Sequence, residues 1–402
     1  MLRLFLVKRE KKEGFVREKL AICFIALVRQ SVLYFSILNR KREGRRQAVD
    51  HREEREEENM KKAVSLLLAA AMTTGLAACG STASESTAQT SSAAQSTAES
   101  SAAEAEGTVY QIGICQQQPH EALDQATQGF KDALVEAFGE EGVTFDEQNA
   151  QGDSNTCSTI INGFVSSSYD LIMANGTSAL QAAAAGTADI PILGTSITEY
   201  GVALGIDGFD GTVGGNVSGT SDLAPLNEQA DMLEELFPAD QYATVGMLYC
   251  SAEPNSAYQV EQVTNYLTEK GYTVEDYSFS DSNDLASVVQ GAVGSADVIY
   301  IPTDNTAASN TEIINNVCLP AGVPIIAGEQ GICSGCGVAT LSISYYDLGY
   351  ATGQMAVQVL TGEADISTMP IEYAPNFTKM YNPTNCEELG ITIPDGYVAI
   401  EE

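Results

Sequence analysis

A stretch that occurs twice constrains the fold of this chain more than any other feature. One copy begins at Asp170 and the other at Asp297. Each has a short apolar run, a polar turn, a helical segment and a second apolar run introduced by Pro191 or Pro324. A run that is apolar throughout is typical of a strand buried on both faces of a parallel sheet, and strand, helix and strand form a right-handed βαβ unit. Two copies predict two similar Rossmann-like α/β lobes whose polar turns face a shared cleft.

The chain before the lobes has the features of a leader. Met60-Lys-Lys, an apolar run and Leu-Ala-Ala before Cys79 predict a bacterial signal peptide over 60–78. The four residues Leu-Ala-Ala-Cys79 resemble the lipobox of bacterial lipoproteins. This resemblance implies lipidation of Cys79. Residues 1–59 fit nothing that follows, and Arg29 makes a membrane span there costly. We interpret 1–59 as a mis-called extension upstream of a true start at Met60.

Residues 79–107 are almost all Ser, Thr, Ala and Glu. Such a segment buries too little apolar surface to offset the entropy of ordering it. It predicts a disordered tether that holds a globular body off a membrane. We therefore expect an extracytoplasmic protein on the outer face of the cell membrane, in contact with it through the lipid anchor only.

Charge limits the possible partners once the leader is removed. The chain from Cys79 onward keeps three lysines, Lys131, Lys270 and Lys379, no arginine, and 44 acidic residues, a net charge of −41. Nucleic acid and anionic membrane surfaces are poor partners for such a body. Without arginine, an anionic ligand group has to bind backbone N–H groups at helix N-termini and Ser or Thr hydroxyls. A cationic group would find carboxylates easily.

Alternating strands and helices continue through the globular part and place the two lobes along the chain. We assign 108–223 plus 343–370 to an N-terminal lobe, and 224–342 plus 371–402 to a C-terminal lobe.

Several short motifs carry a resemblance to one family. They are Gln116-(x)3-His120-x-Ala-Leu-Asp, Asn149-Ala-Gln-Gly-Asp, Ser221-Asp-Leu-x-Pro, Ser251-x-Glu-x-Asn-Ser256, Pro302-Thr-Asp-Asn-Thr306 and Tyr345-Tyr-Asp-x-Gly349. The body resembles the ABC-transporter substrate-binding lipoproteins that bind aromatic amino acids, chiefly tryptophan and tyrosine. The resemblance implies a type I periplasmic-binding-protein fold with three hinge crossovers, and an ABC permease with its ATPase as partners.

A zwitterionic amino acid needs an anion site, a cation site and a wall for its side chain. Hydroxyls and helix N-termini at Thr177, Ser178 and Thr303 could hold the carboxylate, and Asp304, Glu253 or Asp222 the ammonium. His120 and Gln116 could contact the side chain. The candidate ligand-binding residues are Gln116, His120, Thr177, Ser178, Ser196, Asp222, Glu253, Asn255, Ser256, Thr303, Asp304, Asn305 and Glu329.

Each candidate also has a plainer explanation. Thr, Ser, Asp and Asn before a helix usually act as N-caps. His120 follows Pro119 and could be an exposed turn residue, with Glu253 in a similar position. Asp222 could form a hydrogen bond in the hinge instead of touching a ligand.

Nothing in the sequence indicates an enzyme, a cofactor or a metal site. Walker loops, Gly-x-Ser-x-Gly elbows and metal-binding His pairs are absent. His120 is the one histidine after Cys79, which leaves little general-base capacity. Cys333-Ser-Gly-Cys336 has redox spacing, but a strand pattern follows it and no second close pair exists for zinc. A local disulfide or reduced thiols are the remaining alternatives for the seven body cysteines.

The simplest function consistent with these features is that of a solute receptor, whose lobes close on an amino acid and deliver it to a permease. The same fold could bind a sugar or nucleoside, or present its ligand to a membrane sensor. We further expect Asp304→Ala to weaken amino-acid binding more than folding.

Overall fold

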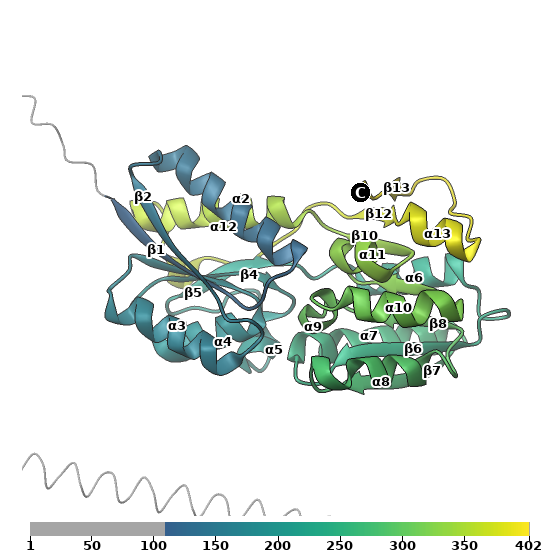
Figure 1. Cartoon of the computed structure of the whole chain (residues 1–402). Coiled ribbons are helices and arrows are strands. Elements are labelled where there is room, and N and C mark those ends of the chain that lie inside the picture. Colours follow the sequence, from purple (N-terminus) through teal and green to yellow (C-terminus); the bar gives the residue numbers. More distant parts are fainter. Residues whose placement is uncertain (1–108, 402) are drawn as a thin grey trace, which may run out of the picture. The chain divides into compact units, whose positions relative to one another are not determined.

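The computed structural model describes residues 109–401, which form two α/β lobes (Figure 1). The predicted extension, signal peptide and tether, with Cys79, lie outside the described residues. Within the described part, no helix has both the length and the apolar character needed to span a bilayer.

The first lobe is built on a six-stranded sheet in the order β11-β5-β4-β3-β1-β2. Its elements are β1 (Tyr110–Gln116), α2 (Glu121–Phe138), β2 (Val143–Asn149), α3 (Ser154–Ser166), β3 (Leu171–Asn175), α4 (Thr177–Gly186), β4 (Ile192–Ile197), α5 (Tyr200–Leu204), β5 (Val217–Ser221), α12 (Tyr345–Thr361), the 3-10 turn η1 (Ile366–Thr368) and β11 (Glu372–Tyr373).

The second lobe is built on a seven-stranded sheet in the order β13-β12-β10-β9-β8-β6-β7. Its elements are α6 (Leu226–Leu236), β6 (Thr244–Cys250), α7 (Pro254–Glu269), β7 (Thr273–Phe279), α8 (Ser282–Ala292), β8 (Val298–Ile301), α9 (Asn305–Ala308), α10 (Thr311–Ala321), β9 (Ile325–Ala327), α11 (Gln330–Cys336), β10 (Ala339–Ser342), β12 (Thr378–Tyr381), α13 (Pro383–Leu389) and β13 (Val398–Ala399).

The two sheets repeat one topology. The order β5-β4-β3-β1-β2 in the first lobe matches β10-β9-β8-β6-β7 in the second, and the strands within each set are parallel. Every residue of the two repeated strands β3 and β8 is buried, as their continuous apolar runs predict. The predicted two-lobed α/β fold is therefore confirmed. One departure from a purely parallel arrangement is β12, which pairs antiparallel with β10.

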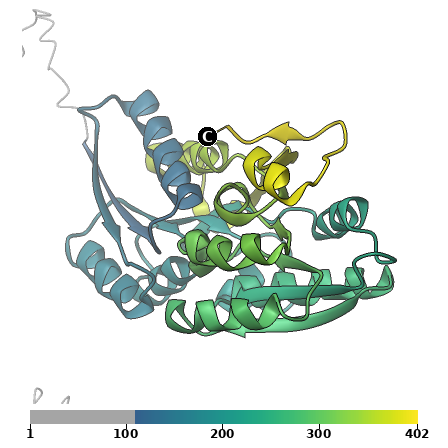
Figure 2. The same ribbon diagram turned by 45° about the vertical axis from the view of Figure 1, so that its right-hand side comes forward.

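Helices cover both faces of the first sheet. Helices α2 and α12 lie side by side on one face, and α3 and α4 cover the other (Figures 1 and 2). The α2–α12 contact depends on glycine, since a Cβ on Gly129 would lie 2.1 Å from the Tyr346 carbonyl oxygen and one on Gly349 would lie 1.9 Å from that of Ala126. This close approach fixes the positions of His120 and Tyr345, which stand at the starts of the two helices.

Three passages of chain connect the two sheets. They are 222–225 after β5, 343–344 between β10 and α12, and 374–377 between β11 and β12. The sequence placed the last boundary at 370. Sheet pairing puts it after Tyr373, because the two-residue strand β11 pairs with β5 in the first sheet. So short an edge strand has no readable alternation in the sequence.

The structure also shows elements that the sequence pattern did not resolve. Strand β5 lies at the end of the Gly-rich passage, and Gly219 in it has φ 143°. The helical segment of the second repeat is two helices, α9 and α10. The chain after 382 forms α13 and β13.

Candidate functional site

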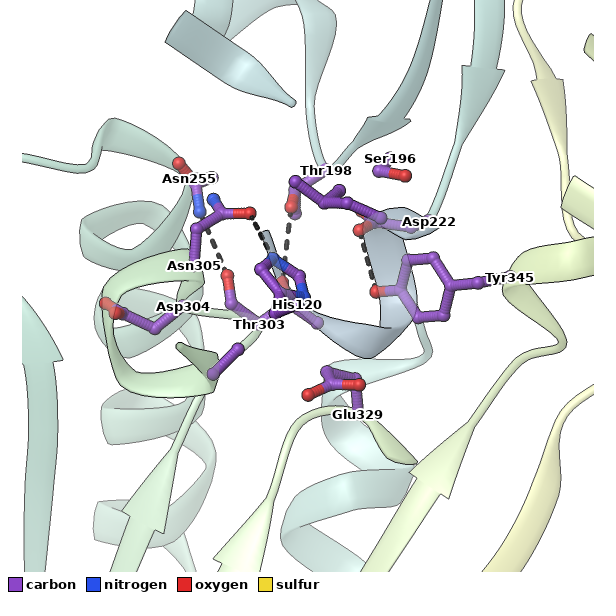
Figure 3. Close-up of a pocket in the computed structure, with 12 residues that line it drawn as sticks. His120, Ser196, Thr198, Asp222, Asn255, Thr303, Asp304, Asn305, Glu329 and Tyr345 are labelled. Atoms are coloured by element: carbon purple, nitrogen blue, oxygen red, sulfur yellow. Dashed lines mark hydrogen bonds between the residues drawn. The ribbon is translucent and has the colours of Figure 1, made fainter. Parts of the chain in front are cut away.

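A small cavity lies between the lobes, at the carboxyl ends of the strands (Figure 3). Its volume is about 20 Å³, room for about one water molecule. The walls come from both lobes and from the first crossover, and Tyr345 stands directly after the second. They are formed by His120, Leu123, Ser196, Thr198, Asp222, Asn255, Thr303, Asp304, Asn305, Ala308, Glu329 and Tyr345.

Eight of the thirteen predicted residues line this cavity: His120, Ser196, Asp222, Asn255, Thr303, Asp304, Asn305 and Glu329. The other five stand behind the walls. Gln116 bonds to the Gln118 carbonyl oxygen, Asp124 and Thr127. Thr177 and Ser178 begin α4, and Ser256 is fully buried in α7. Glu253 holds the start of α9.

A bulge in β4 turns one hydroxyl into the cavity. The pairing of β4 with β5 shifts register between Gly194 and Ile197, and Ser196 there has φ 55°. This left-handed backbone is uncommon for a residue with a side chain and is typical of functional sites. Ser196 is 7% exposed, and its Oγ has no hydrogen-bond partner among the described residues. The bulge thus presents a free buried hydroxyl to a guest.

Asp222, on the first crossover, presents the second unpaired group. Its Oδ2 accepts a hydrogen bond of 2.9 Å from the Tyr345 hydroxyl, while its Oδ1 is buried without a partner among residues 109–401. Burial raises the pKa of Asp222 above its ordinary value. A buried carboxylate without a cation is unfavourable. An entering ammonium group would supply the missing partner.

The second lobe uses its own acids to cap α9. Asp304 accepts hydrogen bonds from the backbone N–H groups of Cys250 (2.6 Å) and Ala307 (2.8 Å). Glu253 accepts from the N–H groups of Asn305 (3.0 Å) and Thr306 (2.9 Å). Burial, and then the charge of Glu253, raise the pKa of Asp304 to about 8. Both oxygens of each carboxylate are therefore already engaged by the chain itself.

The other helix N-termini near the cavity are occupied as well. Glu329 accepts from the N–H groups of Gly331 (2.6 Å) and Ile332 at the start of α11. The Gln117 side-chain oxygen accepts from the Ser178 N–H at the start of α4 (2.8 Å). The sequence predicted that backbone N–H groups at helix N-termini hold a ligand carboxylate. At these helices the N–H groups already donate to side chains of the protein itself. Hydroxyl groups remain as the available donors.

Glu329 makes stability depend on pH. Burial raises its pKa from the ordinary 4.5 to about 7. The folded state then holds a proton that the unfolded chain releases above about pH 4.5, so this stabilisation is lost as pH rises through 7. We expect Glu329 to contribute a fall on the order of 2 kcal/mol in the free energy of unfolding between pH 5 and 8. Urea unfolding of the wild type and of Glu329→Gln would measure it, and an equal fall in the variant would contradict the assignment.

Direct hydrogen bonds join the lobes around the cavity. The Gln118 side-chain amide donates to the Asn305 carbonyl oxygen and to Ser309 Oγ (2.8 Å). Ser309 Oγ donates to the Pro119 carbonyl oxygen (3.0 Å), and the hydroxyls of Thr198 and Thr303 lie 3.3 Å apart. These contacts describe a closed arrangement, and a guest the size of an amino acid requires the lobes to part.

His120 lines the cavity, with its Nε2 3.1 Å from the Asn305 side-chain oxygen (Figure 3). Because that oxygen can only accept, Nε2 carries the proton. Burial lowers the pKa of His120, so the ring is neutral near pH 7. A neutral imidazole leaves the cavity without a positive side chain among its lining residues.

The cysteines take no part in the site. The seven described cysteines are buried free thiols, which decides between the two alternatives left by the sequence. Burial raises the pKa of Cys318 to about 12 and that of Cys386 to about 11. Thiols of this kind are unreactive. Within 109–401 no group of His, Cys, Asp and Glu is placed to hold a metal ion.

Sequence reasoning missed four lining residues, Leu123, Thr198, Ala308 and Tyr345. Thr198 follows Ser196 by two residues, at the end of a repeated strand, and this position could have identified it. Tyr345 lies in a motif that the sequence singled out, but its contact with Asp222 depends on where two crossovers meet.

Comparisons with known proteins show the family to which the chain belongs. The family model for ABC transporter substrate-binding proteins matches residues 111–400. A tyrosine-binding protein of Clostridioides difficile (strain R20291) is 36% identical over 262 residues, which are 65% of this chain and 75% of that protein. The chain belongs to the ABC transporter substrate-binding protein family. That family places it among binding proteins rather than enzymes.

Two solved structures are similar over 73% of this chain. An ABC domain from Streptococcus pneumoniae in complex with L-Trp is 32% identical, is covered completely and gives a TM-score of 0.69. The ligand-free, open structure of an adhesive substrate-binding protein from Clostridium difficile is 34% identical, is covered to 99% and gives 0.57.

Proposed function

We propose that this protein captures an aromatic amino acid between its lobes and delivers it to an ABC permease. The observation that carries the proposal is Asp222, a buried carboxylate that lines the cavity and whose Oδ1 has no hydrogen-bond partner among the described residues. It supplies the negative partner that an α-ammonium group needs. The names of the relatives, which bind tyrosine or L-Trp, support an aromatic amino acid as the class of ligand.

The α-carboxylate is assigned to the hydroxyls of Ser196 and Thr198. The ammonium and carboxylate of an amino acid are attached to the same carbon, so their two binding sites have to be neighbours. Ser196, Thr198 and Asp222 lie on the same side of the cavity (Figure 3). The ligand's side chain then extends toward His120 and Leu123 when the lobes part to admit it.

Free aromatic L-amino acids are therefore expected to stabilise the protein. A ligand at 100 times its Kd adds about 2.7 kcal/mol, which raises Tm by about 5 °C in a protein of this size. A thermal-shift series with tyrosine, tryptophan and phenylalanine would measure the effect, with sugars and nucleosides as comparison ligands.

N-acetyl-tyrosine is the matched control, because it keeps the ring and the carboxylate but has no ammonium group. It should leave Tm unchanged. Equal stabilisation by tyrosine and N-acetyl-tyrosine would exclude Asp222 as the ammonium site, and stabilisation by sugars alone would exclude the amino-acid function.

We also propose that Cys79 carries the lipid that anchors the body outside the cell. The lipobox-like sequence before it supports this assignment, as does the tether-like composition after it. Labelled fatty acid should enter the wild-type protein in a bacterial host and not a Cys79→Ser variant, which should appear in the soluble fraction. Labelling of the variant would contradict the assignment.

A further inference from the structure

A second cavity of about 370 Å³ lies at the hinge. It is large enough for a small molecule, since ligand pockets begin at about 300 Å³. Its walls come from the end of β5, from the first two turns of α12 and from the chain at the third crossover. It borders all three passages between the lobes, because Thr220 precedes the first crossover, Ser344 ends the second, and Ala374 to Asn376 lie on the third.

The walls combine apolar surface with negative charge. Leu348, Ala351, Ala374 and Pro375 provide apolar contacts, and the Tyr373 ring, 54% exposed, is available to a guest. Asp347 and Glu372 are the charged lining residues. The neighbouring Lys379 does not neutralise them, because its amine pairs with Glu235 at 2.6 Å.

An anionic guest is disfavoured although α12 begins here. Ser344 already caps the helix by accepting from the Asp347 N–H (3.1 Å), and the Asp347 carboxylate itself occupies the first turn, where negative charge is stabilised. A second anion would face both Asp347 and Glu372. A cation with an apolar body matches the charge and the walls together.

We propose that the hinge cavity binds a small organic ammonium ion, such as a primary amine on an aliphatic or aromatic body. The guest lies against every passage that has to move when the lobes part. Because the cavity exists in the closed arrangement, the guest favours closure. Because the cleft of this closed arrangement has room for about one water molecule only, the guest weakens the binding of an amino acid there.

The contacts between the two sites are short. Thr220 Oγ1 lies 2.8 Å from Thr352 Oγ1 and 3.3 Å from Thr195 Oγ1, and Thr195 precedes the cavity-lining Ser196 of the cleft. On the second crossover Ser344 borders the hinge cavity, and the next residue, Tyr345, bonds to Asp222 in the cleft. Both cavities thus lie next to the first and second crossovers.

The probe for the test is cyclohexylammonium chloride with the full-length chain, at ionic strength matched with NaCl. Saturation-transfer NMR should detect its binding. Ala351→Trp, which fills the cavity, should abolish that signal, and Ala185→Trp on the exposed face of α4 should leave it unchanged. The isosteric double variant Asp347→Asn, Glu372→Gln should weaken the probe about tenfold. Undetectable binding, or binding unaffected by these hinge variants, would overturn the site.

The coupling is tested separately and rests on the proposed function. Calorimetry should show tyrosine binding about fivefold weaker in the presence of the probe, and the probe binding weaker by the same factor in the presence of tyrosine. An unchanged tyrosine affinity would overturn the coupling. If no amino acid binds at all, the proposed function fails, while the NMR result still decides whether the hinge cavity binds an amine.

Discussion

Asp222→Asn is expected to weaken aromatic amino-acid binding by at least about 100-fold. In the wild type, the Tyr345 hydroxyl donates to Asp222 Oδ2 at 2.9 Å. The substitution keeps the size of the side chain and an oxygen that can accept this hydrogen bond. It removes the negative charge that faces the ligand's ammonium group in a buried site. Loss of one partner of a buried charge pair costs about 2–5 kcal/mol, and 100-fold corresponds to about 2.7 kcal/mol. Isothermal titration calorimetry on the folded variant would measure the loss.

Asp395→Asn provides the control for the change in net charge. Asp395 is exposed, in the loop before β13, and is not among the residues that line the cavity. The substitution Asp395→Asn changes the total charge by the same amount as Asp222→Asn. Its amino-acid affinity should equal that of the wild type. An Asp222→Asn variant that binds within about threefold of the wild type would remove Asp222 from the site.

Asp304→Ala is expected to destabilise the fold by about 3 kcal/mol. Asp304 is 1% exposed, and its carboxylate accepts from the Cys250 and Ala307 N–H groups. Removing it leaves both buried donors unpaired and uncaps α9; a lost cap costs about 1 kcal/mol and an unpaired buried donor about 1–3 kcal/mol. The sequence suggested a larger effect on binding than on folding. The observed contacts reverse that expectation, and urea unfolding would test it.

Asp153→Ala is the matched comparison, because Asp153 caps α3 in the same way on the surface. It accepts from the Thr156 N–H at 2.6 Å and is exposed. We expect a loss of about 1 kcal/mol there. Equal losses at the two positions, or an Asp304→Ala variant of wild-type stability with greatly weakened binding, would restore the ligand-binding role for Asp304.

The duplicated architecture was predictable because a strand buried on both faces has a continuous apolar sequence. Strands such as β3 and β8 have to be apolar throughout, and the polar turns that follow them could be placed at the carboxyl edge of a sheet. This reasoning placed Thr303, Asp304 and Asn305, which follow β8, at the edge of the sheet where they line the cavity. Short edge strands such as β11 have no such apolar sequence.

The sequence could not predict which acidic residues of the site cap a helix and which face a ligand. An aspartate before a helix has the same sequence signature whether it caps that helix or faces a ligand. Asp304 has both oxygens bonded to backbone amides, whereas Asp222 has one oxygen without a partner among the described residues. That difference depends on which N–H groups fold back within reach. The left-handed backbone at Ser196 likewise arises from a register shift between strands far apart in the sequence.

The glycine contact between α2 and α12 has a consequence for the order in which the chain can fold. Helix α2 packs against α12, which begins at Tyr345, more than 200 residues later in the chain. During synthesis or export the five parallel strands of the second lobe, β6 to β10, are all available before α12 emerges. The first lobe therefore completes its packing only after these five strands have emerged. Until then, the apolar face that α12 covers is a surface that a chaperone would need to shield.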